Sequence, residues 1–336
     1  MRARLVTFAA LATLGGLAMT QTPRRLNPVI ELLEQKKPVF GLYAPANPGG
    51  GRGGRGGADS AAAAAAAAAA QAAAKTPAQL AADALAYPNA DLIFSGTMEG
   101  NFDRGYATFT EFARGMSDGG VLQKAPYAHL KQPLFVKMTK IGSDHALAAE
   151  RISKQLNLGV AGVVFVNVES ATELKAGLAA MRFRSNGGTR PDAVGVAPAH
   201  WGMTDAQYRQ KADLWPLNKN GELVNWTIVE SREGIDKIRE IAAVPGIGVL
   251  FPGAGTLRGV YSTTDANGQR VRDDAAWEAA IQKVLVACKE FSVPCGYPAT
   301  ANDIEMRMQQ GFSVFIINWG DAGFRTVDIG RRVGGR

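Results

Sequence analysis

Short apolar runs recur along the chain and alternate with amphipathic stretches. The runs predict strands at 38–44, 91–95, 133–138, 161–168, 225–230, 246–251, 293–298 and 312–318. Between them lie helical patterns, among them SDHALAAERISKQLN, ATELKAGLAAMRF, SREGIDKIREIAAV and DDAAWEAAIQKVLVACKEF. Strands that alternate with helices indicate a parallel sheet. Eight nearly continuous apolar strands favour a closed (β/α)8 TIM barrel, an α/β fold. The alternative is a doubly wound open sheet, although no GxGxxG turn follows the first strand.

Two segments stand apart from this alternation. Residues 47–75 are rich in Gly, Arg and Ala and have too little apolar variety to bury a core, so they predict a low-complexity insertion. The first twenty residues place two arginines before an apolar run, which is typical of a bacterial secretory signal. We therefore expect a signal peptide over 1–20, a single barrel domain over 27–330, export to the periplasm, and no membrane span after signal removal. A retained N-terminal anchor is the alternative.

Composition and charge change this picture little. The chain has 336 residues and a formal net charge of +7, part of which comes from arginines near its ends. We expect the side chains of these arginines to be exposed to solvent at the two ends of the chain. The arginines are Arg2, Arg4, Arg24, Arg25, Arg331, Arg332 and Arg336. A nucleic-acid partner is not expected, because basic residues and aromatics do not interleave in one cluster. The two cysteines, Cys288 and Cys295, leave a disulfide and two buried thiols equally open.

Candidate chemistry follows from the barrel, because active sites of this fold lie at the carboxyl ends of the strands. Glu99 follows the second predicted strand, Lys137 ends the third, and Glu230 ends the fifth. A glycine-rich turn follows the sixth strand; it consists of Gly253, Ala254, Gly255 and Thr256. Its backbone N–H groups could bind a carboxylate or phosphate, or it could be a plain strand-to-helix turn. Asn167 and Glu169 follow the fourth strand.

The stretch VESREGIDKIREIAAVPGIGVLFPGAGTL resembles the HpcH/HpaI-type aldolase family, the metal-dependent pyruvate aldolases of the phosphoenolpyruvate/pyruvate barrel superfamily. PLFVKMTKIGSDHALAAERISKQLNLGVAGVVFVNVESATELKAGLAAMRF resembles the central part of the same family. The resemblance runs from about Asn27 to Val327. It implies a TIM barrel that cleaves or forms a carbon–carbon bond next to a small 2-oxo acid. A divalent metal (Mg²⁺, Mn²⁺ or Co²⁺) held by a Glu and an Asp would stabilise the pyruvate enolate.

The family pattern is matched only in part. Glu230 matches the metal-binding glutamate, and Lys137 falls where an arginine is expected, keeping the charge without the bidentate fork. Glu99 falls where a histidine is expected, and Ile228 where a glutamine is usual. Thr256 stands in place of the second metal-binding aspartate, and a threonine hydroxyl is a poor ligand for Mg²⁺ or Mn²⁺.

Each candidate also has a structural interpretation. Glu230 could cap the following helix instead of binding a metal. Glu99 could be a solvated loop acid instead of a substitute base or ligand. Lys137 needs a partner if it faces inward, since a lone buried charge is costly, and we expect Glu230 or a substrate carboxylate. A Schiff-base role for Lys137 is a further alternative.

The leading hypothesis is thus a divalent-metal-dependent lyase that acts on a small 2-oxo acid, with Glu99 and Lys137 as catalytic residues, Glu230 as metal ligand and residues 253–256 binding substrate. Two alternatives remain open. One is a non-catalytic descendant of the aldolase barrel that binds a small acid or a partner. The other is a metal-assisted hydrolase on the same fold. Family members commonly form oligomers, so the resemblance also implies a homo-oligomer.

Overall fold

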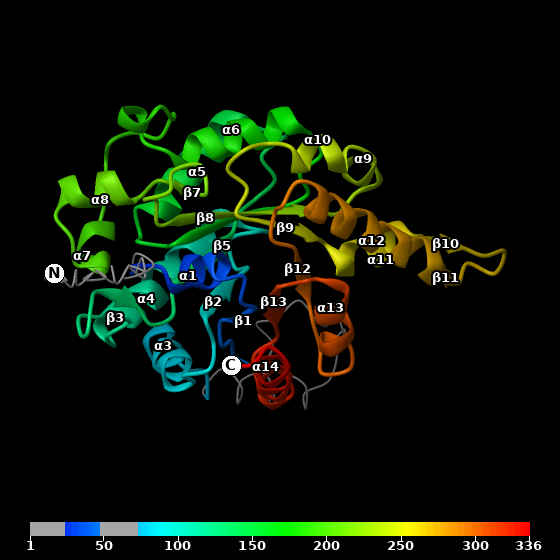
Figure 1. The fold of residues 1–336 in the computed structure, drawn as a ribbon, viewed down its shortest axis with the longest axis horizontal. Helices are drawn as coiled ribbons and strands as arrows, with labels where there is room; N and C mark the ends of the chain where they lie inside the picture. Colours follow the sequence, from blue (N-terminus) through cyan, green and yellow to red (C-terminus); the bar gives the residue numbers. More distant parts are fainter. Residues whose placement is uncertain (1–23, 48–72) are drawn as a thin grey trace, which may run out of the picture.

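A closed ring of parallel strands forms the centre of the molecule (Figure 1), in a computed structural model that describes residues 24–47 and 73–336. The ring confirms all the predicted strands, at β1 (Val39–Tyr43), β2 (Leu92–Ser95), β5 (Leu134–Lys137), β6 (Gly162–Phe165), β8 (Leu223–Val229), β9 (Val249–Pro252), β12 (Gly296–Pro298) and β13 (Val314–Ile317). The strands pair in parallel in the order β1, β2, β5, β6, β8, β9, while β12 pairs with β13 and β13 pairs with β1. A single parallel bridge between Leu250 and Cys295 joins β9 to the residue before β12. The chain therefore forms the expected TIM barrel rather than an open sheet.

Helices surround the barrel, as Figure 1 shows. Polar residues begin many of them: Asp144 caps α5 (His145–Leu156) and Ser170 caps α6 (Ala171–Met181), each accepting a hydrogen bond from a first-turn N–H group. The other helices are α1 (Pro28–Glu34), α3 (Pro77–Ala86), α4 (Phe102–Asp118), α7 (Ala197–Trp201), α8 (Asp205–Lys211), α9 (Arg232–Asp236), α10 (Ile238–Ala242), α11 (Ala254–Val260), α12 (Asp274–Glu290), α13 (Ile304–Gln310) and α14 (Asp321–Val333). Within the described ranges, no helix is both long and apolar enough to cross a bilayer.

Two predictions of detail differ from the structure. The pattern SREGIDKIREIAAV predicts one helix, but the backbone turns at Lys237 and gives α9 and α10. The break keeps Ile235, Ile238 and Ile241 buried on the two pieces. Short strands were also not predicted, because two or three partly exposed residues carry no periodic signal. They are β3 (Leu122–Gln123), β4 (His129–Leu130), β7 (Leu214–Trp215), β10 (Ser262–Thr264) and β11 (Arg270–Arg272). The β10–β11 hairpin extends away from the barrel in Figure 1.

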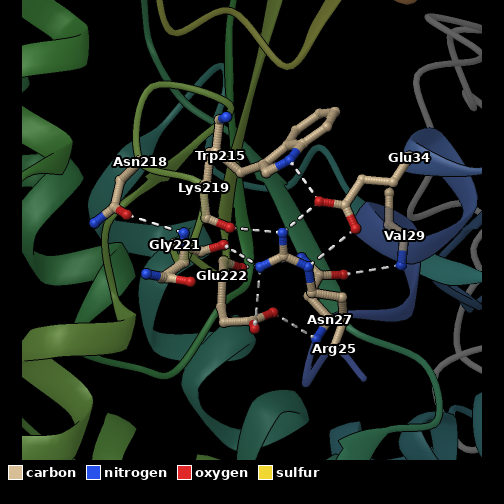
Figure 2. A network of polar contacts seen from close by, with 10 residues as sticks. Arg25, Asn27, Val29, Glu34, Trp215, Asn218, Lys219, Gly221 and Glu222 are labelled. Atoms are coloured by element: carbon tan, nitrogen blue, oxygen red, sulfur yellow. Dashed lines mark hydrogen bonds and ion pairs between the residues drawn. The ribbon is translucent and has the colours of Figure 1, made fainter. Parts of the chain in front are cut away.

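The expectation of solvated ends is wrong for Arg25. Its side chain is 5% exposed and lies in a polar network that joins the start of the described chain to the segment before β8 (Figure 2). The guanidinium contacts Glu34, donates to the Lys219 carbonyl oxygen at 2.7 Å, and lies 3.7 Å from Glu222. Asn27 donates its backbone N–H to the same Glu222 carboxylate at 3.0 Å. The buried Glu222 carboxylate thus draws the arginine inward, since a buried acid needs a cationic partner.

The opposite end of the chain behaves in the same way. Arg336 donates to both oxygens of the buried Asp91 carboxylate at 2.7 Å, and Arg331 reaches it at 3.2 Å. These arginines hold the C-terminal helix α14 against the start of β2. Part of the charge assigned to solvated ends is therefore paired inside the fold.

An aromatic layer fills the barrel interior beneath the carboxyl ends of the strands. The Trp226 ring centroid lies 4.9 Å from that of Phe135, 6.0 Å from Phe94 and 6.2 Å from Phe251. A side chain at Gly162 would place its Cβ 2.2 Å from the Phe135 ring, so β6 carries a glycine where that ring enters the interior. The barrel is a packed core with an aromatic floor.

The two cysteines form a disulfide, which decides between the two alternatives that the sequence leaves open. Cys288 lies near the end of α12 and Cys295 directly precedes β12, and both are buried. The bridge therefore fixes α12 to the strand that follows it.

Candidate active site

A cavity of about 400 Å³ opens at the carboxyl ends of the barrel strands. It brings together most of the side chains predicted from the sequence. Lys137 at the end of β5, Glu230 after β8, and the turn of Gly253, Ala254, Gly255 and Thr256 after β9 all line it. Its remaining lining residues are Tyr43, Phe94, Trp226, Ile228, Phe251, Pro298 and Ile316. The cavity therefore has an apolar floor and a charged wall.

A larger cavity, about 620 Å³, lies at the other end of the barrel. Residues that precede strands line it, such as Lys37 before β1, Ile247 before β9 and Ser313 before β13. Chemistry in this fold belongs to the carboxyl ends of the strands, so the smaller cavity is the candidate active site.

Strand β8 supplies one wall of the site by simple alternation. Successive strand residues point to opposite faces, so Trp226, Ile228 and Glu230 all face the interior. Ser231, directly after Glu230, starts α9 by accepting a hydrogen bond from the Gly234 N–H at 3.1 Å. The capping role is therefore taken by Ser231, and the Glu230 side chain is left to face the cavity.

The Glu230 carboxylate is held close to the end of the neighbouring strand. Gly253 donates its N–H to the Val229 carbonyl oxygen at 2.9 Å. A Cβ at position 253 would lie 2.6 Å from Glu230 Oε2, so only glycine lets β9 end this close. Glu230 is 8% exposed and makes no hydrogen bond or ion pair with the described residues. A buried carboxylate in this position is available to a ligand or a proton.

Lys137 has a different partner from the one expected. Its ammonium Nζ lies 3.3 Å from Glu99 Oε2, and the side chains are 9% and 15% exposed. The ion pair therefore forms with Glu99, while Glu230 lies more than 4 Å away from any cation of the described residues. Gln155 steadies the end of β5 by donating to the Lys137 carbonyl oxygen at 3.2 Å.

Tyr43, Lys137 and Glu99 converge around Gly96. A Cβ built at that glycine would lie 3.8 Å from Tyr43 Cε1, 3.9 Å from Lys137 Cδ and 4.0 Å from Glu99 Oε2. Lys137 lines the cavity and Glu99 does not. Glu99 therefore lies at the edge of the site, beside Lys137.

The donor set bears on the metal that the family resemblance implies. Of the described acids at the site, Glu99 is bonded to Lys137 and Glu230 faces the cavity unpaired, while Thr256 contributes a hydroxyl. Within residues 24–47 and 73–336, no three His, Cys, Asp or Glu side chains gather so as to hold a metal ion. The residues present do not fit a site built from two acids. Divalent-metal binding by Glu230 stays a prediction.

Other candidates lie outside the cavity. Glu169 contacts Lys140 in a neighbouring polar hollow, together with His145 and Glu233. His200 donates its Nδ1–H to the Leu158 carbonyl oxygen at 2.7 Å, and burial lowers the pKa of its ring, as in a packed histidine. Asn167 adopts a φ of 47° after β6, a left-handed conformation that sequence reasoning missed.

The aromatic lining was also missed. Tyr43, Phe94, Trp226 and Phe251 each lie in a predicted strand, but the sequence alone does not give the register that turns them inward. The signal that was available is the two-residue spacing of Trp226, Ile228 and Glu230.

Comparison with known proteins gives a consistent result. Residues 119–320 match the family model described as HpcH/HpaI aldolase/citrate lyase. A hydroxypyruvate/pyruvate aldolase from Paraburkholderia phytofirmans is 25% identical over 252 residues, which cover 74% of this chain and 81% of that protein. A 2-dehydro-3,6-dideoxy-6-sulfogluconate aldolase from Pseudomonas putida is 28% identical over 163 residues, 48% of this chain and 58% of its own length.

Solved structures share the fold. An HpcH/HpaI aldolase/citrate lyase family protein from Burkholderia cenocepacia J2315 superposes with a TM-score of 0.61 at 20% identity, covering 87% of this chain and 92% of that one. The family model spans more than half of the chain and the fold agrees with it. The chain belongs to the HpcH/HpaI aldolase/citrate lyase family.

Proposed function

We propose that this protein is a carbon–carbon lyase that cleaves or forms the bond next to a small 2-oxo acid. The observation that carries the proposal is one cavity, at the carboxyl ends of the barrel strands, that is lined by both the Lys137 ammonium and the unpaired Glu230 carboxylate. Family membership and the names of its aldolase relatives support this reaction class.

The two charged groups match the two demands of the reaction. Cleavage needs a base for the proton of the substrate hydroxyl, and Glu230 offers a carboxylate with no other described partner. Negative charge then develops on the 2-oxo acid fragment. Lys137 supplies positive charge beside an apolar cavity floor, where such stabilisation is stronger than in bulk water. The apolar floor of Phe94, Trp226 and Phe251 excludes water from the enolate.

Such lyases form the enolate of the 2-oxo acid or its equivalent. This partial reaction can be tested without knowing which aldehyde is the second substrate or product. An enzyme that forms the enolate of pyruvate exchanges the methyl protons for deuterium in D2O, which proton NMR records. We expect exchange by the wild type and a loss of about 100-fold or more in Glu230→Gln, the usual cost of removing a catalytic base. The matched control is Glu233→Gln, an exposed acid one helical turn away that pairs with Lys237.

The same assay distinguishes the alternatives. Exchange that disappears with EDTA and returns with Mg²⁺, Mn²⁺ or Co²⁺ would establish the divalent-metal dependence that the resemblance implies. Tight pyruvate binding without exchange would contradict the lyase and favour a non-catalytic small-acid-binding descendant. Export and homo-oligomer formation stay predictions of the sequence.

A further inference from the structure

The incomplete metal site leaves the developing charge of the reaction without its expected partner. The position of the second metal-binding acid carries Thr256, and the nearby acid Glu99 is already bonded to an ammonium. Among the described residues, the cation that lines the cavity is a primary amine, and a primary amine can form a covalent bond to a carbonyl carbon.

We propose that Lys137 acts as a covalent catalyst, forming an imine with the C2 carbonyl of the 2-oxo acid in place of a bound divalent metal. This inference rests on the proposed lyase function and names how that function is carried out. The ligand that binds in the cavity beside Lys137 is a small 2-oxo acid with a free keto group, such as pyruvate.

The surroundings of Lys137 suit a nucleophilic amine. Its side chain is 9% exposed, and its tip reaches the cavity beside the aromatic residues Tyr43 and Phe94. A primary amine held beside a base in such a cavity can be activated as a nucleophile toward a carbonyl carbon. Glu99 Oε2, at 3.3 Å, is placed to accept the ammonium proton before the amine attacks. An arginine in the same place would lack this reactivity, because the guanidinium stays protonated.

The second carboxylate is independent of this pair. Glu230 comes from β8, while Glu99 and Lys137 follow β2 and end β5, and no ion pair joins Glu230 to Lys137. One acid can therefore serve the amine while the other serves the hydroxyl of the substrate. Two acids placed apart can divide the proton transfers of imine chemistry between them.

The steps balance with these groups alone. The neutral amine adds to C2, Glu99 returns the ammonium proton to the former carbonyl oxygen, and that oxygen leaves as water to give the iminium. The C3–C4 bond then breaks, its electron pair becomes the C2–C3 double bond of an enamine, and the iminium electrons return to nitrogen. Glu230 takes the proton of the C4 hydroxyl as the aldehyde departs. Glu230 returns its proton to C3, and one water hydrolyses the imine, which releases the 2-oxo acid and restores the amine.

The decisive measurement is reductive trapping. The purified protein is incubated with pyruvate and sodium borohydride in the presence of EDTA, digested, and analysed by mass spectrometry. We expect one reduced pyruvate per chain, on the peptide that contains Lys137, together with irreversible loss of methyl-proton exchange. Omission of pyruvate should abolish the adduct.

Three variants sharpen the result. Lys137→Arg keeps the positive charge and removes the nucleophile, so the adduct should disappear. Lys140→Arg is the matched control, because Lys140 lies three residues away and is bonded to Glu169; its adduct should equal that of the wild type. Glu99→Gln keeps the amine but removes its proton acceptor, and trapping should slow about tenfold or more.

The outcomes separate the two proposals. Methyl-proton exchange that EDTA abolishes, with no adduct on any lysine, would overturn the imine and leave the lyase in place. An adduct on Lys137 without exchange or aldol cleavage would support the imine and overturn the lyase. An adduct that persists in Lys137→Arg would also overturn the assignment, because another amine would then be the one that reacts.

Discussion

Gly162 illustrates how a single residue sets the shape of the active-site floor. Its missing side chain makes room for the Phe135 ring, which packs against Trp226 beneath the cavity. Hydrophobic patterning places this glycine in a strand, but not against an aromatic ring, because the contact joins β6 to its neighbour β5.

We predict that Gly162→Ala lowers the free energy of unfolding by about 1–3 kcal/mol, the usual cost of overpacking a core. The added methyl would lie 2.2 Å from Phe135, so the ring or the backbone would have to shift. Urea denaturation measures the change. Gly100→Ala is the control, since a Cβ there meets nothing within 4 Å; an equal loss in both variants would contradict the packing explanation.

The residues of the candidate site were predictable to different degrees. Lys137 and Glu230 could be selected because strand ends of a barrel converge, and both line the cavity. The partner of Lys137 could not be predicted, because the choice between Glu99 and Glu230 depends on which loop folds back over the ammonium. No sequence pattern encodes the distance of either carboxylate from the ammonium.

At the scale of elements, one buried ion pair joins α6 to the segment that starts β7. Arg182, directly after α6, donates to both oxygens of Asp213, at 2.6 and 3.0 Å. Burial by itself would raise the pKa of Asp213, but hydrogen bonds from Arg182, Asn218 and the Leu214 N–H outweigh it and lower the pKa below the ordinary 3.8. The ionised form is therefore the one that the fold stabilises.

Asp213→Asn should destabilise the protein at pH 7 by about 2 kcal/mol, the range for hydrogen bonds to charged groups. Because the folded-state pKa is depressed, this stabilisation is fully present above pH 3.8 and is lost as the pH falls through the lower folded-state value. The difference between the two proteins should thus shrink below pH 3.8. Denaturation curves at pH 7 and pH 3 measure it, with the exposed Asp205→Asn as control. A gap that stays constant with pH would refute this role for the carboxylate.

Elements were predicted well where their pattern was long and poorly where it was short. The strands of the barrel are buried on both faces, so they appear as apolar runs bounded by turns. The pairs β3–β4 and β10–β11 pair only two or three residues each and lie at the surface. These short strands form because their connecting loops bring them together. Their residues carry too short a pattern to predict a strand from the sequence.

At the scale of the whole molecule, the low-complexity segment predicted at 47–75 lies between β1 and α3 in the chain. Most of it, 48–72, lies outside the described residues, but its two flanks are visible. The Asn47 amide donates to the Lys75 carbonyl oxygen, and the Lys75 N–H donates back to the Asn47 side chain, each at 2.8 Å. The chain therefore leaves the barrel and returns to it at one point.

We expect replacement of residues 49–74 by a short glycine linker to change the free energy of unfolding by no more than about 1 kcal/mol, because loop length enters closure entropy only logarithmically. Thermal and urea denaturation of the shortened protein measure this. A loss of several kcal/mol would mean that the segment contributes contacts to the fold.

The network around Arg25 has a consequence for how the polypeptide is processed. The arginine lies only a few residues beyond the predicted signal, yet its guanidinium is anchored to Glu222 and to the Lys219 carbonyl oxygen. A peptidase that cut after residue 20 would leave this anchor intact. A cut several residues later would expose the Glu222 carboxylate without its cation. The buried network thus defines how far trimming can proceed before maturation begins to damage the product.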